Sequence, residues 1–93
     1  MSNLRKSARG RECQVRIPGY CNHDNETVIL AHKNGGGMGM KSPDLHGAFC
    51  CSSCHDILDG RVRLYNYEAD KIKVMLYEGI FRTQQIWIDE GLI

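Results

Sequence analysis

The sequence predicts a small α+β domain that is stapled by a metal ion and ends in a long helix. Three observations indicate this fold class: two pairs of cysteines, two short apolar segments between the pairs, and a helical apolar stripe in the last third of the chain. With 93 residues there is room for one core only, so we expect a single domain over residues 1–93. A domain of this size often needs a staple.

The cysteines supply that staple. A C-x-x-C pair is preceded by an earlier pair eight residues apart, and thiols so arranged can face one tetrahedral zinc ion. We therefore predict a closed structural zinc site with four ligands: Cys13, Cys21, Cys51 and Cys54. Cys50 is then a packed spare thiol, and His23 is an alternative to Cys21. A redox role for the C-x-x-C pair is the competing interpretation, but the sequence lacks the thioredoxin-like βαβ pattern that it requires.

Composition and charge narrow the class of protein. An apolar content of 42% with 25% charged residues is typical of a globular domain and excludes a disordered chain. The N-terminus is polar and no apolar run approaches the roughly 20 residues of a membrane span. We therefore expect a cytoplasmic protein, in which cysteines stay reduced and more often bind metal.

The net charge of +1 conceals an asymmetry, because residues 1–16 carry +4 and the rest of the chain carries −3. We predict that a basic arm over residues 1–12 contacts DNA phosphates. Its four cations are Arg5, Lys6, Arg9 and Arg11. A solvated basic terminus is the alternative that charge alone allows.

The first half of the chain is predicted to contain short elements. A helical turn is expected at Leu4–Ala8. Polar and apolar residues alternate over Glu12–Ile17, which predicts a strand, and the turn signal Pro18–Gly19 would return the chain to Cys21 as a hairpin.

Two further strands and a helix form the centre of the zinc-flanked region, residues 13–60. The β-branched run Thr27–Ala31 predicts a strand that ends at His32, and Gly47–Cys50 predicts its successor. A helix over 52–58 should end near Gly60. The glycine-rich segment 34–43 lacks the G-K-[ST] ending of a phosphate-binding loop, and either a mobile flap or a simple connection fits it.

The last third of the chain predicts one long helix over residues 66–90, with Asn66 as its N-cap. Its apolar stripe should form the core, and Met75, Tyr77 and Phe81 should widen it. The stripe consists of Ala69, Ile72, Leu76, Ile80, Thr83 and Trp87.

The two histidines at the ends of these central elements suggest phosphodiester hydrolysis. His32 ends a strand, and His55 lies on the helix one turn before Asp59. One imidazole could remove a proton from water, while a divalent ion held by the other stabilises charge on the phosphate. His46 is interpreted as a surface residue.

The region from Cys13 to Gly60 resembles the HNH (ββα-metal) endonucleases, in the variant with a zinc-binding pair on either side of the catalytic hairpin. Residues 4–19 and the segment Arg82–Thr83–Gln84 leading to Trp87 look like the YbcO-type prophage proteins, a group similar to a RecA-dependent phage recombination nuclease. The resemblance extends over nearly the whole chain.

The resemblance implies a role for each matching position. His32 matches the general base, His55 matches a ligand of the catalytic Mg²⁺ or Mn²⁺, and Asp44 stands near the family's central asparagine. Many members place Asp or His directly before the first histidine as a second metal ligand, but this chain has Ala31. We expect Asp59 to replace that ligand.

The sequence thus predicts a zinc-stapled HNH-like domain that cuts DNA with Mg²⁺ or Mn²⁺, in a phage or prophage recombination context and with a RecA-type filament as a candidate partner. The alternative is a zinc-binding nucleic-acid or protein adaptor without catalysis. The Ala31 departure favours the adaptor, and the pairing of His32 with His55 favours the enzyme.

Overall fold

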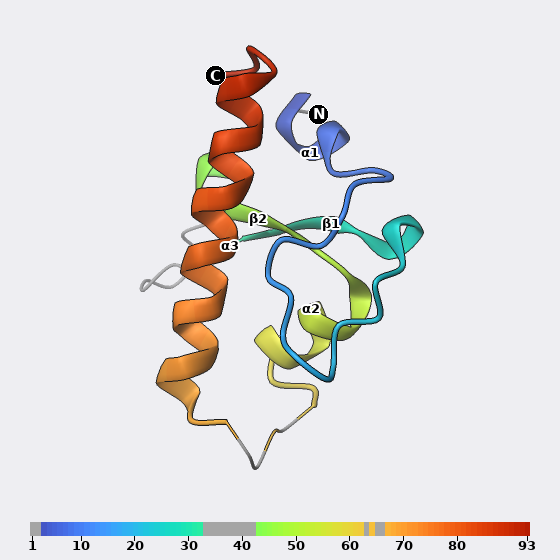
Figure 1. Ribbon diagram of the computed structural model, residues 1–93, viewed down its shortest axis with the longest axis vertical. Coiled ribbons are helices and arrows are strands. Elements are labelled where there is room, and N and C mark those ends of the chain that lie inside the picture. The colour runs from blue at the N-terminus through green and yellow to red at the C-terminus, as the bar shows by residue number, and fades with distance from the viewer. Residues whose placement is uncertain (1–2, 33–42, 63, 65–66) are drawn as a thin grey trace.

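The computed structural model describes residues 3–32, 43–62, 64 and 67–93. Helices flank a two-stranded sheet, with 3-10 turns η1 (Asn25–Thr27) and η2 (Asp44–His46) before the two strands (Figure 1). The helices and strands are α1 (Asn3–Ser7), β1 (Ile29–His32), β2 (Gly47–Cys50), α2 (Ser52–Leu58) and α3 (Ala69–Asp89). The predicted α+β class with a long C-terminal helix is confirmed.

The sheet confirms both central strands. β1 and β2 pair antiparallel, with Ile29 opposite Cys50 and His32 opposite Gly47. The register requires glycine at position 47, because a Cβ atom there would lie 2.7 Å from the Leu30 side chain. β2 is buried along its whole length, and α2 begins two residues after it ends. The order β1, β2, α2 therefore places the strand-end histidine and the helix on one small scaffold.

Helix α3 packs across β2 and supplies the core's largest side chain (Figure 1). The rings of Phe49 and Trp87 meet edge to face with centroids 5.8 Å apart. The Thr83 hydroxyl donates to the Gly79 carbonyl at 2.8 Å and accepts from the Phe49 N–H at 3.0 Å. One buried side chain thus ties the helix to the sheet.

The strand predicted over Glu12–Ile17 is wrong, because this segment is an irregular loop. Arg16 adopts a φ of 51°, which breaks the extended conformation. The backbone N–H of Arg16 donates to the thiol of Cys13, and the Gln14 carbonyl accepts from the Arg82 guanidinium at 2.8 Å. The Cys13 and Arg82 side chains thus bind backbone groups that would pair with a neighbouring strand if this segment were extended.

The same loop lies directly against α3. A Cβ atom at Gly79 would approach the Gln14 carbonyl oxygen and the Val15 Cα to 3.1 Å. The glycine that interrupts the helical stripe therefore provides room for the loop that carries the first cysteine.

The long helix differs from its prediction at its start and in its width. It begins at Ala69 with Glu68 in the N-cap position, while Asn66, the predicted N-cap, lies outside the described residues. The stripe is fully buried at Thr83 and Trp87 but not towards the N-terminus. Tyr77 and Phe81 do not widen the core: both are exposed, Phe81 by 68%. Both side chains lie on α3 away from the face that packs on the core.

The N-terminal segment is anchored on α3. The indole N–H of Trp87 donates to the Ser7 hydroxyl at 2.8 Å, and the Arg11 guanidinium forms two hydrogen bonds to the Glu90 carboxylate at 2.6 and 2.7 Å.

Within the described part of the chain, no helix has the length and apolar character to cross a membrane. The predicted flap, residues 34–43, lies outside the described residues except for Pro43.

Candidate metal centre and active site

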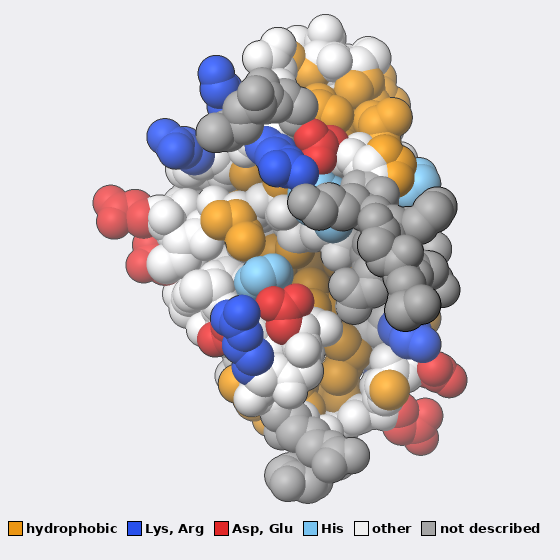
Figure 2. Space-filling model, turned by 180° about the vertical axis from the view of Figure 1, so that it is seen from behind, with side chains coloured by type: hydrophobic (Ala, Val, Ile, Leu, Met, Phe, Trp, Pro, Cys, Tyr) orange, Lys and Arg blue, Asp and Glu red, His pale blue; other side chains and the backbone are white. Residues whose placement is uncertain are grey.

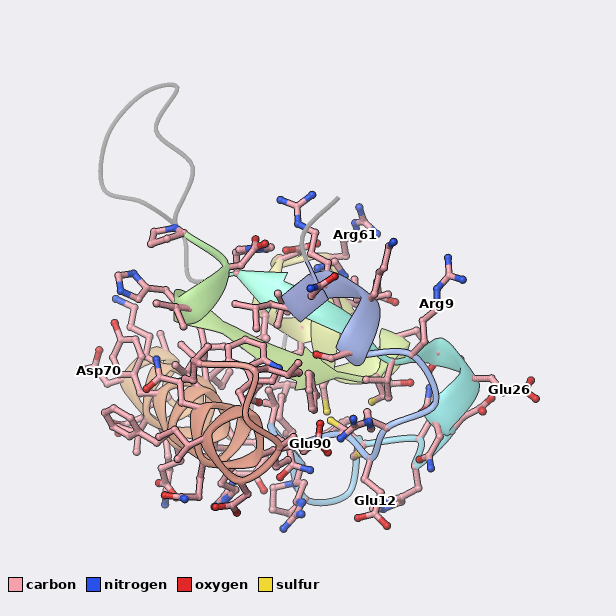
Figure 3. All side chains as sticks on the ribbon, turned by 90° about the horizontal axis from the view of Figure 1, so that it is seen from above. Arg9, Glu12, Glu26, Arg61, Asp70 and Glu90 are labelled. Atoms are coloured by element: carbon pink, nitrogen blue, oxygen red, sulfur yellow. The ribbon has the colours of Figure 1, made fainter. Side chains whose placement is uncertain are left out.

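Four thiols converge between the 13–21 loop and the start of α2. The Sγ atoms of this cluster all lie within 4.8 Å of one another. Its members are Cys13, Cys21, Cys51 and Cys54, the four predicted zinc ligands. Figure 3 shows sulfur atoms gathered inside the molecule, whereas the labelled side chains of Arg9 and Glu26 point outward. The four predicted thiols do come together, although the loop that brings Cys13 to Cys21 is not a β-hairpin.

The chemistry and spacing of the cluster fit a zinc ion. Zinc–thiolate bonds of about 2.3 Å in a tetrahedron separate the sulfur atoms by about 3.8 Å, and the Sγ atoms of Cys21 and Cys51 are 3.7 Å apart. Cys51 is also the N-cap of α2, where its sulfur accepts the Cys54 N–H at 3.4 Å. Such N–H donors stabilise thiolates, so these four residues could hold a structural metal ion.

The spare thiol and the alternative ligand are both next to the cluster. Cys50 is fully buried, and its thiol donates to the Cys51 carbonyl at 3.4 Å. His23 Nδ1 lies 3.8 Å from the Cys21 sulfur. The register that places Cys51 rather than Cys50 in the cluster agrees with the sequence prediction.

Contacts among Cys13, Cys50 and Cys54 shift the pKa values of these thiols. Hydrogen bonds from Cys50 and Cys54 lower the pKa of Cys13, and the same contacts with Cys13 raise the pKa of both donors. Burial raises the pKa of Cys21 to about 11. One thiolate is thus stabilised at the expense of its neighbours. The positive charge of a bound metal ion would favour the thiolate form of its cysteine ligands.

The first predicted catalytic residue, His32, is paired with a predicted partner. Its Nε2 lies 2.6 Å from Asp44 Oδ1, which reaches back from η2, and the two side chains are about a fifth exposed, at 25% and 17%. Arg5 Nε, from α1, lies 3.2 Å from the same oxygen. We call these three residues the His32 triplet. A carboxylate that accepts the Nε2 proton leaves Nδ1 as a lone-pair acceptor, the form of imidazole that a general base needs.

The second predicted pair lies on α2. His55 Nε2 and Asp59 Oδ2 are 3.5 Å apart, one helical turn from each other, with side chains about a third exposed. Asp59 is the C-cap of the helix, and Arg61 Nη2 lies 4.0 Å from its carboxylate. An imidazole and a carboxylate at this separation could both face one divalent ion.

The structure brings each pair together, but it does not assemble a further ligand group. Among the described residues, the four cysteines are the only group of three or more Cys, His, Asp or Glu ligand atoms within 4.8 Å of one another. His55 and Asp59 therefore stand as a pair without a third such ligand atom among the described residues. Figure 2 shows a face on which histidine, acidic and basic side chains lie in neighbouring groups.

The four cations of the basic arm differ in their contacts. Arg5 contacts Asp44, and Arg11 contacts Glu90, where mutual hydrogen bonding raises the pKa of the guanidinium and lowers the pKa of the carboxyl. Lys6 and Arg9 are exposed and form no ion pair with the described residues. The arm thus has two anchored cations and two that face solvent.

Sequence reasoning missed one feature beside the site. His46, interpreted as a surface residue, is exposed but lines a cavity with Tyr77, Ile80, Phe81 and Gln84 of α3. The aromatic residues at positions 77 and 81, on the stripe's flank, were the available signal, but periodicity assigned them to the core.

Comparison with known proteins identifies the family. A family model described as "Putative nuclease YbcO" matches residues 2–92. The chain belongs to the YbcO family. The match covers the arm, the cysteines, both histidine pairs and α3, so all the features described above lie within the family's domain.

Individual YbcO relatives agree with this assignment. The chain is 50% identical over 96 residues to "Putative nuclease YbcO" of Escherichia coli strain K12, an alignment that covers all of this chain and 98% of the relative. The protein of the same description from Enterobacteria phage 82 matches to the same extent. A solved structure, of "a putative bacteriophage protein" from Escherichia coli K-12 MG1655, is 49% identical and superposes with a TM-score of 0.81, covering 96% of this chain and all of that one.

Proposed function

We propose that this chain is a metal-dependent DNA endonuclease of the HNH (ββα-metal) type, which hydrolyses phosphodiester bonds. The observation that carries the proposal is the 2.6 Å contact between His32 and Asp44 at the end of β1. The element order β1, β2, α2, with His55 on α2, is the order that the HNH resemblance implies. Membership of a family described as nucleases supports the same reaction class.

In this proposal His32 is the general base. Asp44 fixes the ring and its tautomer by accepting the Nε2 proton, so Nδ1 removes a proton from the attacking water. Arg5 neutralises part of the charge on Asp44 and places a cation next to the scissile phosphate. Guanidinium groups match phosphate geometry well.

His55 and Asp59 would hold the catalytic divalent ion. Mg²⁺ commonly binds through one or two protein ligands and keeps several waters, so a two-residue site is compatible with the geometry of this pair. When bound, such an ion stabilises charge on the phosphate and the leaving oxygen. The zinc cluster would have a separate, structural role, because four thiolates leave no open coordination position.

A non-catalytic adaptor is the second candidate, and two observations favour it. Ala31, which directly precedes His32, is a buried residue that offers no metal ligand. His55 and Asp59 also lack a third ligand within 4.8 Å among the described residues. In that case the zinc-stapled domain would bind nucleic acid or protein without cutting.

Plasmid cleavage separates the two candidates. Zinc-loaded protein is incubated with supercoiled plasmid in the presence of Mg²⁺, Mn²⁺ or no added divalent ion, alone and beside a RecA-type recombinase filament, which we propose as a partner. The enzyme proposal expects nicked or linear product only when Mg²⁺ or Mn²⁺ is added. Binding to DNA without product under every condition would leave the adaptor.

A further inference from the structure

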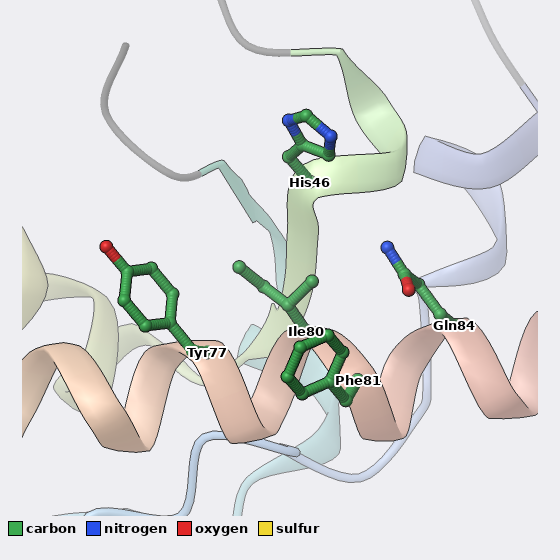
Figure 4. Close-up of a pocket in the computed structure, with 5 residues that line it drawn as sticks. All are labelled: His46, Tyr77, Ile80, Phe81 and Gln84. Carbon is green, nitrogen blue, oxygen red and sulfur yellow. The ribbon is translucent and has the colours of Figure 1, made fainter. Parts of the chain in front are cut away.

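A cavity that includes neither the His32–Asp44 pair nor the His55–Asp59 pair opens between η2 and α3. Its volume is about 250 Å³, and five side chains line it: His46, Tyr77, Ile80, Phe81 and Gln84. Figure 4 shows His46 projecting from η2 on one side, with Tyr77, Ile80 and Gln84 rising from α3 below it and the Phe81 ring lying in front of the helix. Phe81 is 68% exposed although it is a large apolar residue.

The lining combines flat apolar surface with polar edges. Two aromatic rings and Ile80 provide the apolar part, while an imidazole and an amide provide hydrogen-bonding groups. The Gln84 amide N–H donates to the Leu45 carbonyl at 2.6 Å, which fixes this side chain at the rim. Aromatic stacking surfaces beside fixed polar groups are how proteins bind unpaired nucleobases.

The cavity is linked to the candidate active site by η2. This turn carries Asp44, which belongs to the His32 triplet, and two residues later His46, which lines the cavity. Helix α1 also packs against η2, and its Arg5 lies 3.2 Å from Asp44 of that turn. A strand whose phosphate reaches the His32 triplet would therefore pass a cationic edge and have a base near the cavity.

We propose that this cavity receives an unpaired nucleobase of the DNA strand whose phosphate lies at the His32 triplet. The inference rests on the proposed nuclease function and specifies its substrate as single-stranded or locally opened DNA. A base inside a duplex is stacked and paired, so it cannot enter the cavity without being extruded. The volume lies below the roughly 300–1,000 Å³ of pockets for drug-sized ligands, which suits one flat ring.

The test is binding of an oligonucleotide of about 20 residues, single-stranded or as a duplex, to wild-type and variant protein. Phe81→Ala removes the most exposed ring, and Phe81→Trp restores a stacking surface. Ile88→Ala is the matched control, because Ile88 is also exposed on α3 but does not line the cavity. Loss of one stacked base should weaken single-strand binding by about 5- to 150-fold. The tryptophan variant and the control should bind like wild type, and duplex binding should change less.

A salt titration and a fluorescent base test whether the binding loss comes from base stacking at the cavity. The loss caused by Phe81→Ala should be similar at low and high salt, because stacking releases no counterions, unlike phosphate contacts. A 2-aminopurine base in the strand should be quenched by wild type and not by Phe81→Ala. Equal binding of Phe81→Ala and Ile88→Ala, wild-type binding to duplex alone, or a change of oligomeric state in Phe81→Ala would overturn the proposal. Since this readout is binding, a protein that binds single strands through Phe81 but never cuts would contradict the nuclease function and not the cavity.

Discussion

Asp44 Oδ1 accepts a hydrogen bond from His32 Nε2 at 2.6 Å, although twelve residues separate the two in the chain. Arg5 contacts the same oxygen from the N-terminal helix. Three segments that are distant in sequence thus meet at the end of a two-stranded sheet. In the proposed function this contact orients His32 as the general base, and the predictions below follow from it and from the cysteine cluster.

The His32–Asp44 contact predicts a graded effect of substitution. Asp44→Asn keeps a hydrogen-bonding group of the same size and should retain part of the cleavage activity. Asp44→Ala removes the support of the ring, and a misplaced catalytic group can cost on the order of 10²-fold in rate. Cleavage rates measured beside zinc content test this order. Equal activity of Asp44→Ala and wild type would show that Asp44 does not position the base.

The cysteine register predicts opposite results for two adjacent residues. Cys51→Ser should lose zinc and unfold or aggregate, because Cys51 belongs to the cluster, caps α2 and is fully buried. Cys50→Ser should keep about one zinc per chain, since its sulfur is outside the cluster. Elemental analysis and thermal unfolding measure both effects. Loss of zinc from Cys50→Ser with retention in Cys51→Ser would shift the register by one residue.

Gly79 predicts a stability effect that helix propensity alone would get wrong. Alanine is about 1 kcal/mol more favourable than glycine inside an exposed helix. At position 79, however, the added methyl would lie 3.1 Å from backbone atoms of Gln14 and Val15. Displacing that loop should outweigh the gain and destabilise the protein by about 1–3 kcal/mol. Urea unfolding measures this change, and a more stable Gly79→Ala protein would mean that the loop can shift freely.

The division of the basic arm predicts separate effects on binding and stability. Neutralising the exposed Lys6 and Arg9 should flatten the salt dependence of DNA binding, by about 0.9 in log–log slope for each lost phosphate contact. Arg11→Gln should act on the fold, because its partner Glu90 anchors the arm to α3. Binding titrations at several salt concentrations test the first effect, and an unchanged slope for the Lys6 and Arg9 variants would mean that these cations are only solvated.

The anchor to Glu90 also has a pH dependence of defined sign. The hydrogen bonds from Arg11 lower the pKa of the Glu90 carboxyl. Its contribution to stability is present above the unfolded-state pKa and is lost as the pH falls through the lower folded-state value. Wild type and Glu90→Gln should therefore converge in stability under acidic conditions.

Local patterns predicted the elements, and long-range contacts decided the rest. Cysteine spacing predicted the cluster of four thiols, and β-branched residues predicted β1, because both patterns depend on few residues. The failure at residues 12–17 has a physical cause: the Cys13 sulfur accepts the Arg16 N–H, and α3 binds the Gln14 carbonyl. The alternation of polar and apolar residues cannot reveal that side chains compete with a strand for these backbone groups.

The position of Arg5 could not be predicted either. It depends on docking of α1 through the hydrogen bond from Trp87 to Ser7, across 80 residues. The same holds for Phe81, whose 68% exposure depends on which face of α3 packs on the core. The sequence pattern indicates an apolar face, but only the packing partner determines how much of it is covered.

The role of the ion can be separated from that of the base. His55→Ala should lose cleavage because the divalent ion is held weakly, and raised Mn²⁺ should restore part of the rate. His32→Ala removes the proton acceptor, so no concentration of Mn²⁺ should restore it. Identical Mn²⁺ dependence of the two variants would mean that both histidines bind the same ion.

The most direct test is the rate of plasmid cleavage by His32→Ala, compared with wild type at equal zinc content and equal DNA binding, with and without a recombinase filament. Loss of a general base typically costs 10²–10⁴-fold in rate, and we expect a fall of this size with zinc and DNA binding intact. A His32→Ala protein that cuts as fast as wild type would contradict the assignment of His32, and a wild-type protein that binds DNA yet never cuts would contradict the nuclease function itself.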